Sequence, residues 1–163
     1  MFQISRRADY AVRIMLELAL RAGKCVPSRQ ISQRTNVPKA FLHKITADLV
    51  KAGLVRTQAG PHGGLCLNHA ADQINIQQIL EAIEGPICLN ICMRRPQECE
   101  RDLFCPAHDI WGELQTMIVE KMQAATLDIL AAEARQLQKW PRQRDHIPYL
   151  IHHVDMQVIE EKA

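Results

Sequence analysis

The chain has 163 residues, of which 47% are hydrophobic, 23% charged and only 4% aromatic. This composition excludes a disordered or collagen-like chain, and no apolar run approaches the roughly 20 residues that a membrane-spanning helix needs. Residues 1–69 hold 11 Lys and Arg against 3 Asp and Glu, whereas residues 70–163 hold 9 against 15, so the net charge of +2 conceals a basic module followed by an acidic one. We expect a soluble, cytoplasmic protein whose first module binds a polyanion, nucleic acid above all.

The first predicted helix begins at Ser5, whose hydroxyl can cap the free amides of the first turn. It ends at Gly23, which suits the left-handed conformation of a helix end. The stretch from Ala8 to Leu20 is apolar almost all round. Such a helix is buried on more than one side, and a partner subunit could supply the second surface.

Two short helices and a hairpin are predicted next. The first helix covers about 28–35 with Ser28 as its cap, and residues 36–38 turn the chain into a second helix that ends before Gly53. Two short apolar runs around the turn AGPHGG predict a β-hairpin with its tip at residues 59–64. A helix, a helix-turn-helix and a hairpin in this order make a winged helix.

The segment INIQQILEAIEG predicts an amphipathic helix that ends at Gly85, where we place the end of the winged-helix domain, 1–85. Residues 86–105 show no helical period and are predicted to form a loop. Residues 106–140 contain a long amphipathic helix to about residue 125, which we assign to dimerisation. Thr126 and Asp128 then begin a shorter helix. The role of the tail, 141–163, is unknown.

The helix-turn-helix carries the candidate DNA contacts. The start of its second helix should meet base edges in the major groove, whereas other residues contact phosphates. The base-contact candidates are Lys39, Ala40, His43 and Lys44; the backbone-contact candidates are Arg6, Arg7, Ser28, Arg29, Lys51 and Arg56; and the wing adds His62 and Gly63. Any one of these charges could merely solvate an exposed face, but 11 cations against 3 anions favour nucleic acid for the group.

A second group of residues has the chemistry of metal ligands. Cys92, Cys99, Cys105 and His108 are separated by six, five and two residues. Thiolates and imidazole suit zinc or an iron–sulfur cluster, and this spacing is wider than that of a simple zinc knuckle. Their charged neighbours argue against a position in the core.

Cys25 and Cys66 stand apart from this group. One lies at a turn and the other in a predicted strand, and a reducing cytoplasm keeps thiols free. We therefore expect both to be small apolar groups without a role.

Several segments together resemble the iron–sulfur-dependent winged-helix repressors that include the IscR, NsrR and RirA regulators. They are ADYAVRIMLELA, FLHKITADLVKAGLV, the turn GPHGG before a strand, ILEAIEG, and three cysteines followed by a Trp-containing helix and TLDIL. The similarity covers about residues 1–135. It implies a homodimer whose long C-terminal helices cross, with the cysteine loop near the DNA-binding domain of the other subunit. It also implies repression of genes for cluster assembly, nitric oxide defence or iron handling.

The resemblance assigns Cys92, Cys99 and Cys105 as cluster ligands. The fourth ligand varies in the family. His108 matches the histidine of the IscR type, which holds a two-iron cluster, and Asp9 matches an acidic ligand from the other subunit in the NsrR type, which holds a four-iron cluster. Cys88 is a third option. Two departures are that Ala59 stands where the family often has a minor-groove arginine, and that the tail after Trp140 matches nothing in the family.

We therefore predict a mostly α protein with a winged-helix domain, a cluster-binding loop at 86–105 and a dimerisation helix. It would be a homodimeric repressor at inverted-repeat DNA that senses redox, nitric oxide or iron status, with a 2Fe-2S cluster favoured over 4Fe-4S. The alternative is a zinc-stabilised or thiol-redox winged-helix protein-interaction module, or a regulator of that kind without a cluster. No nucleotide-binding glycine loop or catalytic triad supports an enzyme, and no membrane or small-molecule substrate is predicted. His146, His152 and His153 in the tail are weaker metal candidates.

Overall fold

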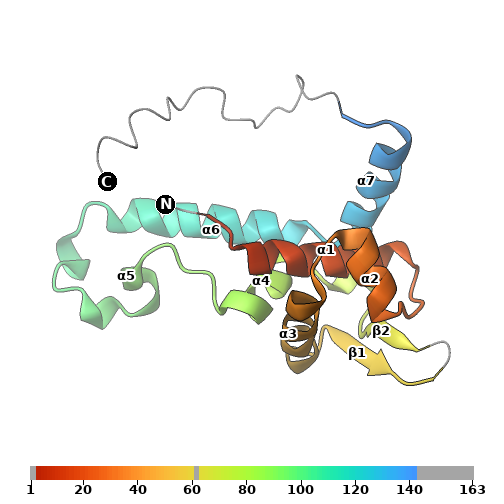
Figure 1. Ribbon diagram of the computed structural model, residues 1–163. Helices are drawn as coiled ribbons and strands as arrows, with labels where there is room; N and C mark the ends of the chain where they lie inside the picture. The colour runs from red at the N-terminus through yellow and green to blue at the C-terminus, as the bar shows by residue number, and fades with distance from the viewer. Residues whose placement is uncertain (1–2, 61–62, 143–163) are drawn as a thin grey trace, which may run out of the picture.

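The structure is a computed structural model that describes residues 3–60 and 63–142 (Figure 1). The described chain is mostly helical, as predicted, and none of its helices is long and apolar enough to cross a membrane. The expectations for His62 and for the tail histidines His146, His152 and His153 lie outside the described residues. The elements are α1 (Arg6–Leu20), α2 (Ser28–Thr35), α3 (Lys39–Lys51), β1 (Val55–Gln58), β2 (Gly64–Leu67), η1 (Ala71–Gln73), α4 (Ile76–Glu84), α5 (Ile91–Arg94), η2 (Pro96–Glu98), η3 (Asp102–Phe104), α6 (His108–Ala124) and α7 (Leu127–Lys139).

Helix α1 forms the centre of the N-terminal body. Its first turn is capped as predicted, because the Ser5 hydroxyl oxygen accepts a hydrogen bond from the Ala8 amide at 3.2 Å. The helix is surrounded by α2, α3, α4, α7 and β2, and residues on several of its sides are buried. One covering surface, which we expected from a partner subunit, comes from α7 of the same chain.

A tight turn joins α2 to α3. The prediction that Ser28 caps α2 is wrong: Ser28 is its first helical residue, because the Pro27 carbonyl already accepts the first helical hydrogen bonds. Asn36 ends α2 in the left-handed conformation, with φ 55°. The Ser32 hydroxyl donates to the Val37 carbonyl at 2.8 Å, which holds the turn before α3 begins.

The predicted hairpin is present, and it has a third partner. β1 and β2 pair antiparallel, with Arg56 opposite Cys66. On the other side of β2, Val26 and Leu65 exchange backbone hydrogen bonds of 2.8 and 2.9 Å. A Cβ at Gly64 would stand 2.3 Å from the Val26 carbonyl oxygen, so this close approach requires glycine. The wing is therefore hydrogen-bonded to the connection between α1 and α2.

Cys25 and Cys66 are joined by a disulfide, so the prediction that both are free thiols is wrong. The cause is tertiary pairing. Because Val26 and Leu65 form a hydrogen-bonded antiparallel pair, Cys25 and Cys66 are the next directly opposed residues, with Cα atoms 4.3 Å apart. Forty-one residues separate the two cysteines, and no local pattern reveals that they meet.

The predicted cluster-binding loop, 86–105, which we call the cysteine loop, contains short helical segments that the absence of a helical period did not predict. It contains the short helix α5 and the two 3-10 turns η2 and η3, and α5 lies at the far end of α6 from α3 and the wing (Figure 1). The Gln115 side chain of α6 anchors the start of the loop, accepting from the Leu89 amide at 2.9 Å and donating to the Ile87 carbonyl at 2.7 Å. Cys92 is buried where α5 packs on α6, against our expectation that the loop cysteines stay out of the core.

Backbone hydrogen bonds join the segment between α6 and α7 to the segment before α4. The Ile76 amide donates to the Ala125 carbonyl at 3.1 Å, and the Leu127 amide donates to the Ile74 carbonyl at 2.8 Å. Both Ile74 and Leu127 are fully buried. The Thr126 hydroxyl donates to the Asp128 carboxylate, which lowers the pKa of Asp128. The chain thus turns from α6 into α7 at Thr126, as predicted, and α7 returns across α1.

Candidate DNA-binding surface and metal centre

One face of α3 is free of the protein core. Leu42, Ile45 and Leu49 anchor the helix in the core. The predicted base-contact residues Lys39, Ala40, His43 and Lys44 are all exposed, and so is Lys51 in the last turn. α3 and the wing lie on the side of the molecule away from α6 (Figure 1). An exposed helix face of this kind, with lysine at both ends, has the dimensions and charge to enter a major groove.

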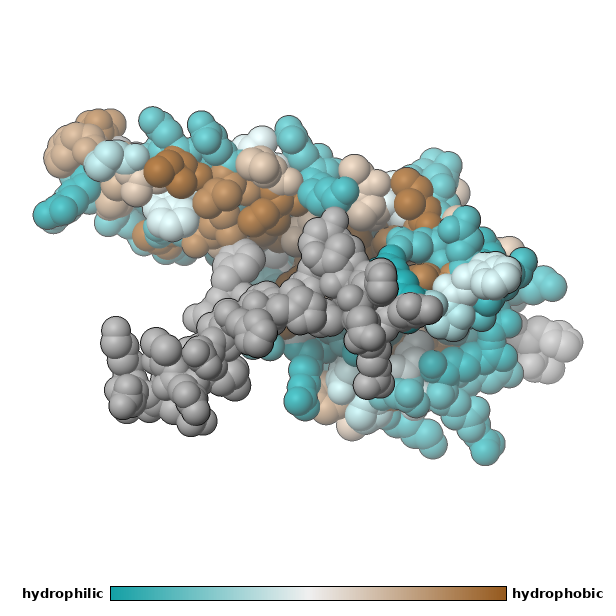
Figure 2. All heavy atoms as spheres, turned by 90° about the horizontal axis from the view of Figure 1, so that it is seen from above, coloured by the Kyte–Doolittle hydropathy of each residue, from teal (hydrophilic) through white to brown (hydrophobic). Residues whose placement is uncertain are grey.

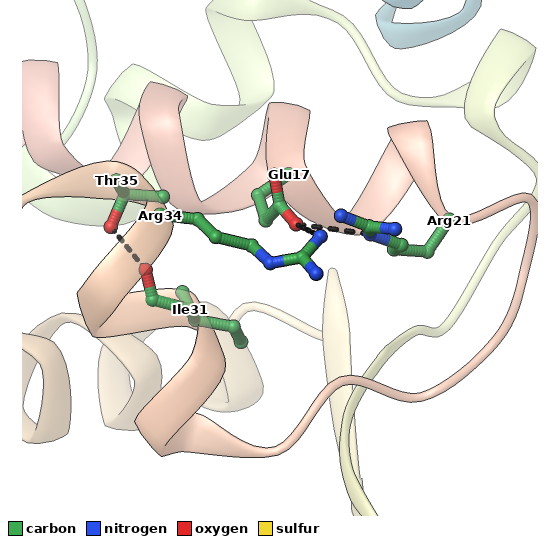
Figure 3. Close-up of polar contacts among 5 residues, drawn as sticks. All are labelled: Glu17, Arg21, Ile31, Arg34 and Thr35. Carbon is green, nitrogen blue, oxygen red and sulfur yellow. Dashed lines mark hydrogen bonds and ion pairs between the residues drawn. The ribbon is translucent and has the colours of Figure 1, made fainter.

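Two ion-pair contacts hold the helix-turn-helix on α1. Arg7 of α1 pairs with Asp48 of α3, so its guanidinium already has a carboxylate partner where we predicted a phosphate contact. Glu17, with only 11% of its side chain exposed, binds Arg21 at 3.0 Å and Arg34 of α2 at 3.1 Å (Figure 3). These contacts tie α2 and α3 to one rigid support.

The Thr35 hydroxyl, also shown in Figure 3, completes the local hydrogen bonding of α2. It is buried, and it donates to the Ile31 carbonyl at 2.7 Å. Because the hydroxyl is satisfied inside its own helix, the end of α2 can be buried without an unpaired polar group.

The remaining backbone-contact candidates surround α3. Arg6 and Arg29 are exposed, Ser28 is partly exposed at the start of α2, and Arg56 projects from β1. At the wing tip, the Gly63 amide donates to the Gly60 carbonyl at 2.9 Å. A Cβ at Gly63 would stand 2.2 Å from the Gln58 carbonyl oxygen, so the turn excludes any larger residue.

The candidate metal ligands lie along the cysteine loop. Cys92 is in α5, Cys99 and Cys105 follow η2 and η3, and His108 is the first residue of α6. Cys99 and Cys105 are partly exposed. In the described part of the chain no three His, Cys, Asp or Glu side chains are gathered closely enough to hold one metal ion. The donor set of three thiols and an imidazole fits an iron–sulfur cluster by its chemistry, and the loop would have to close around it.

The other two candidates for the fourth ligand are placed differently. Asp9 is on α1, where it pairs with Arg13 at 2.7 Å, and α1 lies apart from α5 in the same chain (Figure 1). The Cys88 thiol donates to the Asn90 carbonyl at 2.9 Å just before α5.

An apolar face runs along α6. It begins with the adjacent residues Ile110 and Trp111 and continues at intervals of three residues with Leu114 and Met117. These four side chains are 38–64% exposed. Figure 2 shows hydrophobic side chains gathered over this helix, on the side away from α3. A continuous row of large apolar side chains at helical spacing is typical of a surface that a second helix covers.

Comparison with known proteins identifies the family. Residues 4–133 match Rrf2, a family described as iron-dependent transcriptional regulators. The chain belongs to the Rrf2 family. It is a transcriptional regulator and binds DNA, and the predicted winged-helix class is confirmed. The prediction that it is not an enzyme is also confirmed, because its relatives are transcriptional regulators.

Several relatives of this Rrf2 regulator align with it over most of both chains. The HTH-type transcriptional regulator IscR of Pectobacterium carotovorum is 29% identical over 142 residues, which are 86% of either chain. CymR, described as the global cysteine regulator of B. subtilis, has a TM-score of 0.66 and 28% identity over 82% of this chain and 98% of its own. IscR of T. potens shares the fold, with a TM-score of 0.65, 24% identity, and coverage of 87% and 93%.

The structure of this Rrf2 regulator adds one candidate that sequence reasoning missed. Ala47 is exposed on α3 and lies four residues after His43 and four before Lys51, so it shares their face. A small side chain there would let the helix backbone approach DNA closely. The helical spacing places Ala47 on this face, but alanine has no charge or hydrogen-bonding group that would indicate a DNA contact from the sequence.

Proposed function

We propose that the chain is a homodimeric repressor that reads an inverted-repeat operator and senses redox, nitric oxide or iron status through an iron–sulfur cluster on its cysteine loop. The observation that carries this proposal is that one Rrf2 chain contains both an exposed face on α3, with a lysine at each end, and a separate cysteine loop. Ala40, His43, Lys44 and Ala47 meet base edges in the major groove. Lys51, in the last turn of α3, binds phosphates together with Arg29 and Arg56.

The base-reading role can be separated from phosphate binding with two variants. Lys51→Ala should weaken binding to all sequences alike, because a phosphate contact carries no sequence information. His43→Ala should cost about 1–3 kcal/mol at particular base pairs of the operator and little on non-specific DNA. Fluorescence anisotropy with the operator, its single-base variants and a scrambled duplex measures both.

Lys139→Ala is the matched control, because Lys139 is an exposed lysine on α7. It should leave all affinities unchanged. If His43→Ala and Lys51→Ala have the same effect on every duplex, then His43 does not read bases.

We propose that two copies associate through the apolar face of α6. Burial of Trp111, Leu114 and Met117 against a second α6 would remove large apolar surfaces from water, at about 25 cal/mol per Å². A charge placed in that face would lose its hydration without gaining a partner. Leu114→Glu should therefore shift the protein toward monomer by at least about tenfold in dimer dissociation constant.

Sedimentation velocity at several protein concentrations measures this shift. Ile129→Glu is the control, because Ile129 is an exposed isoleucine on α7, outside the proposed face. A dimer that survives Leu114→Glu and Met117→Glu, or one that dissociates equally with Ile129→Glu, would place the interface elsewhere.

For the cofactor, Cys92, Cys99 and Cys105 would supply three thiolates, with His108, or Asp9 of the other subunit, as the fourth ligand. When bound, a cluster with one weaker ligand supplies a site that oxidants and nitric oxide can attack. The protein's contribution is the loop. Gln115 fixes its start on α6 and His108 lies at its end on the same helix, so a loop that closes or opens changes the surface beside the dimer face.

A further inference from the structure

The Cys25–Cys66 pair lies at the base of the wing, far along the chain from the cysteine loop. The backbone brings these residues together independently of their sulfur atoms, because the Val26–Leu65 hydrogen bonds and the close approach of Gly64 press β2 against the α1–α2 connection. Directly opposed residues without mutual hydrogen bonds are the closest side-chain pair in an antiparallel ladder. A disulfide there needs no rearrangement of the fold.

The two cysteines differ in access to solvent. Cys66 is completely buried, whereas Cys25 is partly exposed and opens into a shallow pocket of about 580 Å³. Lys24 and Arg56 line the same pocket. Cationic neighbours favour the thiolate, which is the form of cysteine that reacts with oxidants. Cys25 is thus placed to react first, and Cys66 to resolve the product.

The pair is connected to the DNA-binding surface through Gln58. The Gln58 side-chain oxygen lies 3.3 Å from Cys25 Sγ and accepts a hydrogen bond of 3.3 Å from Arg56, a candidate phosphate ligand. On the other side, Cys25 comes three residues before the start of α2. A covalent link at this point joins the wing to the helix-turn-helix.

We propose that Cys25 and Cys66 are a redox-active pair whose reversible disulfide clamps the wing onto the helix-turn-helix and raises DNA affinity. The oxidant is a peroxide. The Cys25 thiol loses its proton, and the thiolate attacks one oxygen of hydrogen peroxide; the O–O bond breaks, a sulfenic acid forms, and the departing hydroxide takes up the released proton and leaves as water. The Cys66 sulfur then attacks the Cys25 sulfur, the S–O bond breaks, and a second water leaves with the Cys66 proton. A dithiol reductant reverses the reaction by thiol–disulfide exchange.

The disulfide should raise DNA affinity because it restricts the motion of the wing before DNA binds. In the reduced form only the Val26–Leu65 hydrogen bonds hold β2 to residue 26, so the wing separates from the α1–α2 connection more often than when the covalent bond is present. A wing that is fixed before binding loses less freedom when DNA binds, so the oxidised form should bind about three- to tenfold more tightly. In a reducing compartment the bond would form only under oxidative stress, which suits a regulatory disulfide.

The test begins with the full chain and no DNA. The protein is reduced with a phosphine, treated with hydrogen peroxide or left untreated, alkylated, and digested under non-reducing conditions for mass spectrometry. Peroxide should produce one peptide pair joined through Cys25 and Cys66, and hydrogen exchange at the Val26 and Leu65 amides should become slower. Cys25→Ala should show neither change, and Cys88→Ser should show both.

DNA affinity is then measured in a Cys92→Ala, Cys99→Ala, Cys105→Ala background, which removes any response of a cluster. Oxidation should tighten binding in this background and have no effect when Cys25→Ala is added. Absence of the joined peptide, unchanged exchange at the two amides, or equal affinity of the two forms would each overturn the proposal. Only the affinity step rests on the proposed function. Failure of both forms to bind any duplex would count against the DNA-binding surface, while mapping and exchange decide the clamp by themselves.

Discussion

Raising the salt concentration from about 50 to 200 mM should weaken DNA binding by this protein on the order of a thousandfold or more. A dimer that uses exposed residues such as Arg29, Lys51 and Arg56 from each subunit makes about 6–10 phosphate contacts, and each contact releases counterions from the duplex. Isothermal anisotropy titrations at four or more salt concentrations give the slope of log affinity against log salt.

Single substitutions should change this slope in a predictable way. Lys51→Ala removes one phosphate contact per subunit and should reduce the slope by about 1 for each contact. Lys139→Ala should leave it unchanged, as should Arg135→Ala, since both residues are exposed on α7. DNA binding that is insensitive to salt would contradict these phosphate contacts.

Replacing any one of Cys92, Cys99 and Cys105 by alanine should abolish the colour of protein that is purified without oxygen. The wild-type chain should contain iron and sulfide in the proportions of a cluster, because three thiolates supply most of a cluster's ligand set. With one of these thiolates lost, only two of the three assigned cysteine ligands remain. Absorption and circular dichroism in the visible range, together with iron and sulfide assays, measure the loss.

Further variants distinguish the candidates for the fourth ligand. His108→Ala, Asp9→Ala and Cys88→Ala should each be coloured, and the variant that lacks the true ligand should have an altered spectrum and faster decay in air. Cys25→Ala is the control, because Cys25 lies between α1 and α2 and is bonded to Cys66 of the wing, outside the cysteine loop, and it should match the wild type. Colourless wild-type protein that holds one zinc ion per chain would replace the cluster by a structural metal.

Most helix boundaries could be predicted because they depend on neighbouring residues. Ser5 caps α1, and Asn75 and Gln78 form a reciprocal capping box at the start of α4. Gly85, with φ 81°, ends α4 where the sequence places its end. Two boundaries differ from the prediction. At Ser28 a proline one residue earlier takes the capping position, and α1 ends at Leu20, followed by a turn that includes the left-handed Gly23, where we predicted the helix end.

In the candidate sites, too, features that depend on local spacing could be predicted, whereas features that depend on tertiary contacts could not. The face of α3 follows from helical spacing, so the exposure of His43, Lys44 and Lys51 could be predicted. The Cys25–Cys66 disulfide could not, because it requires knowing that residue 26 pairs with β2. The burial of Cys92 likewise depends on how α5 rests on α6.

The junction at Thr126 affects which spacing between operator half-sites the proposed dimer can recognise. Backbone hydrogen bonds join Ile74 to Leu127 and Ile76 to Ala125. The winged helix is therefore fixed to the end of α6 and is not connected to it by a flexible linker. α6 has 17 residues, a length of about 25 Å. In a dimer held through α6, the separation of the two recognition helices is then set by a rigid rod. One extra base pair between half-sites displaces and rotates one of them, by about 3.4 Å and a tenth of a turn, and the DNA must bend or twist to compensate. A regulator built in this way discriminates between operators by their spacing as well as by their bases.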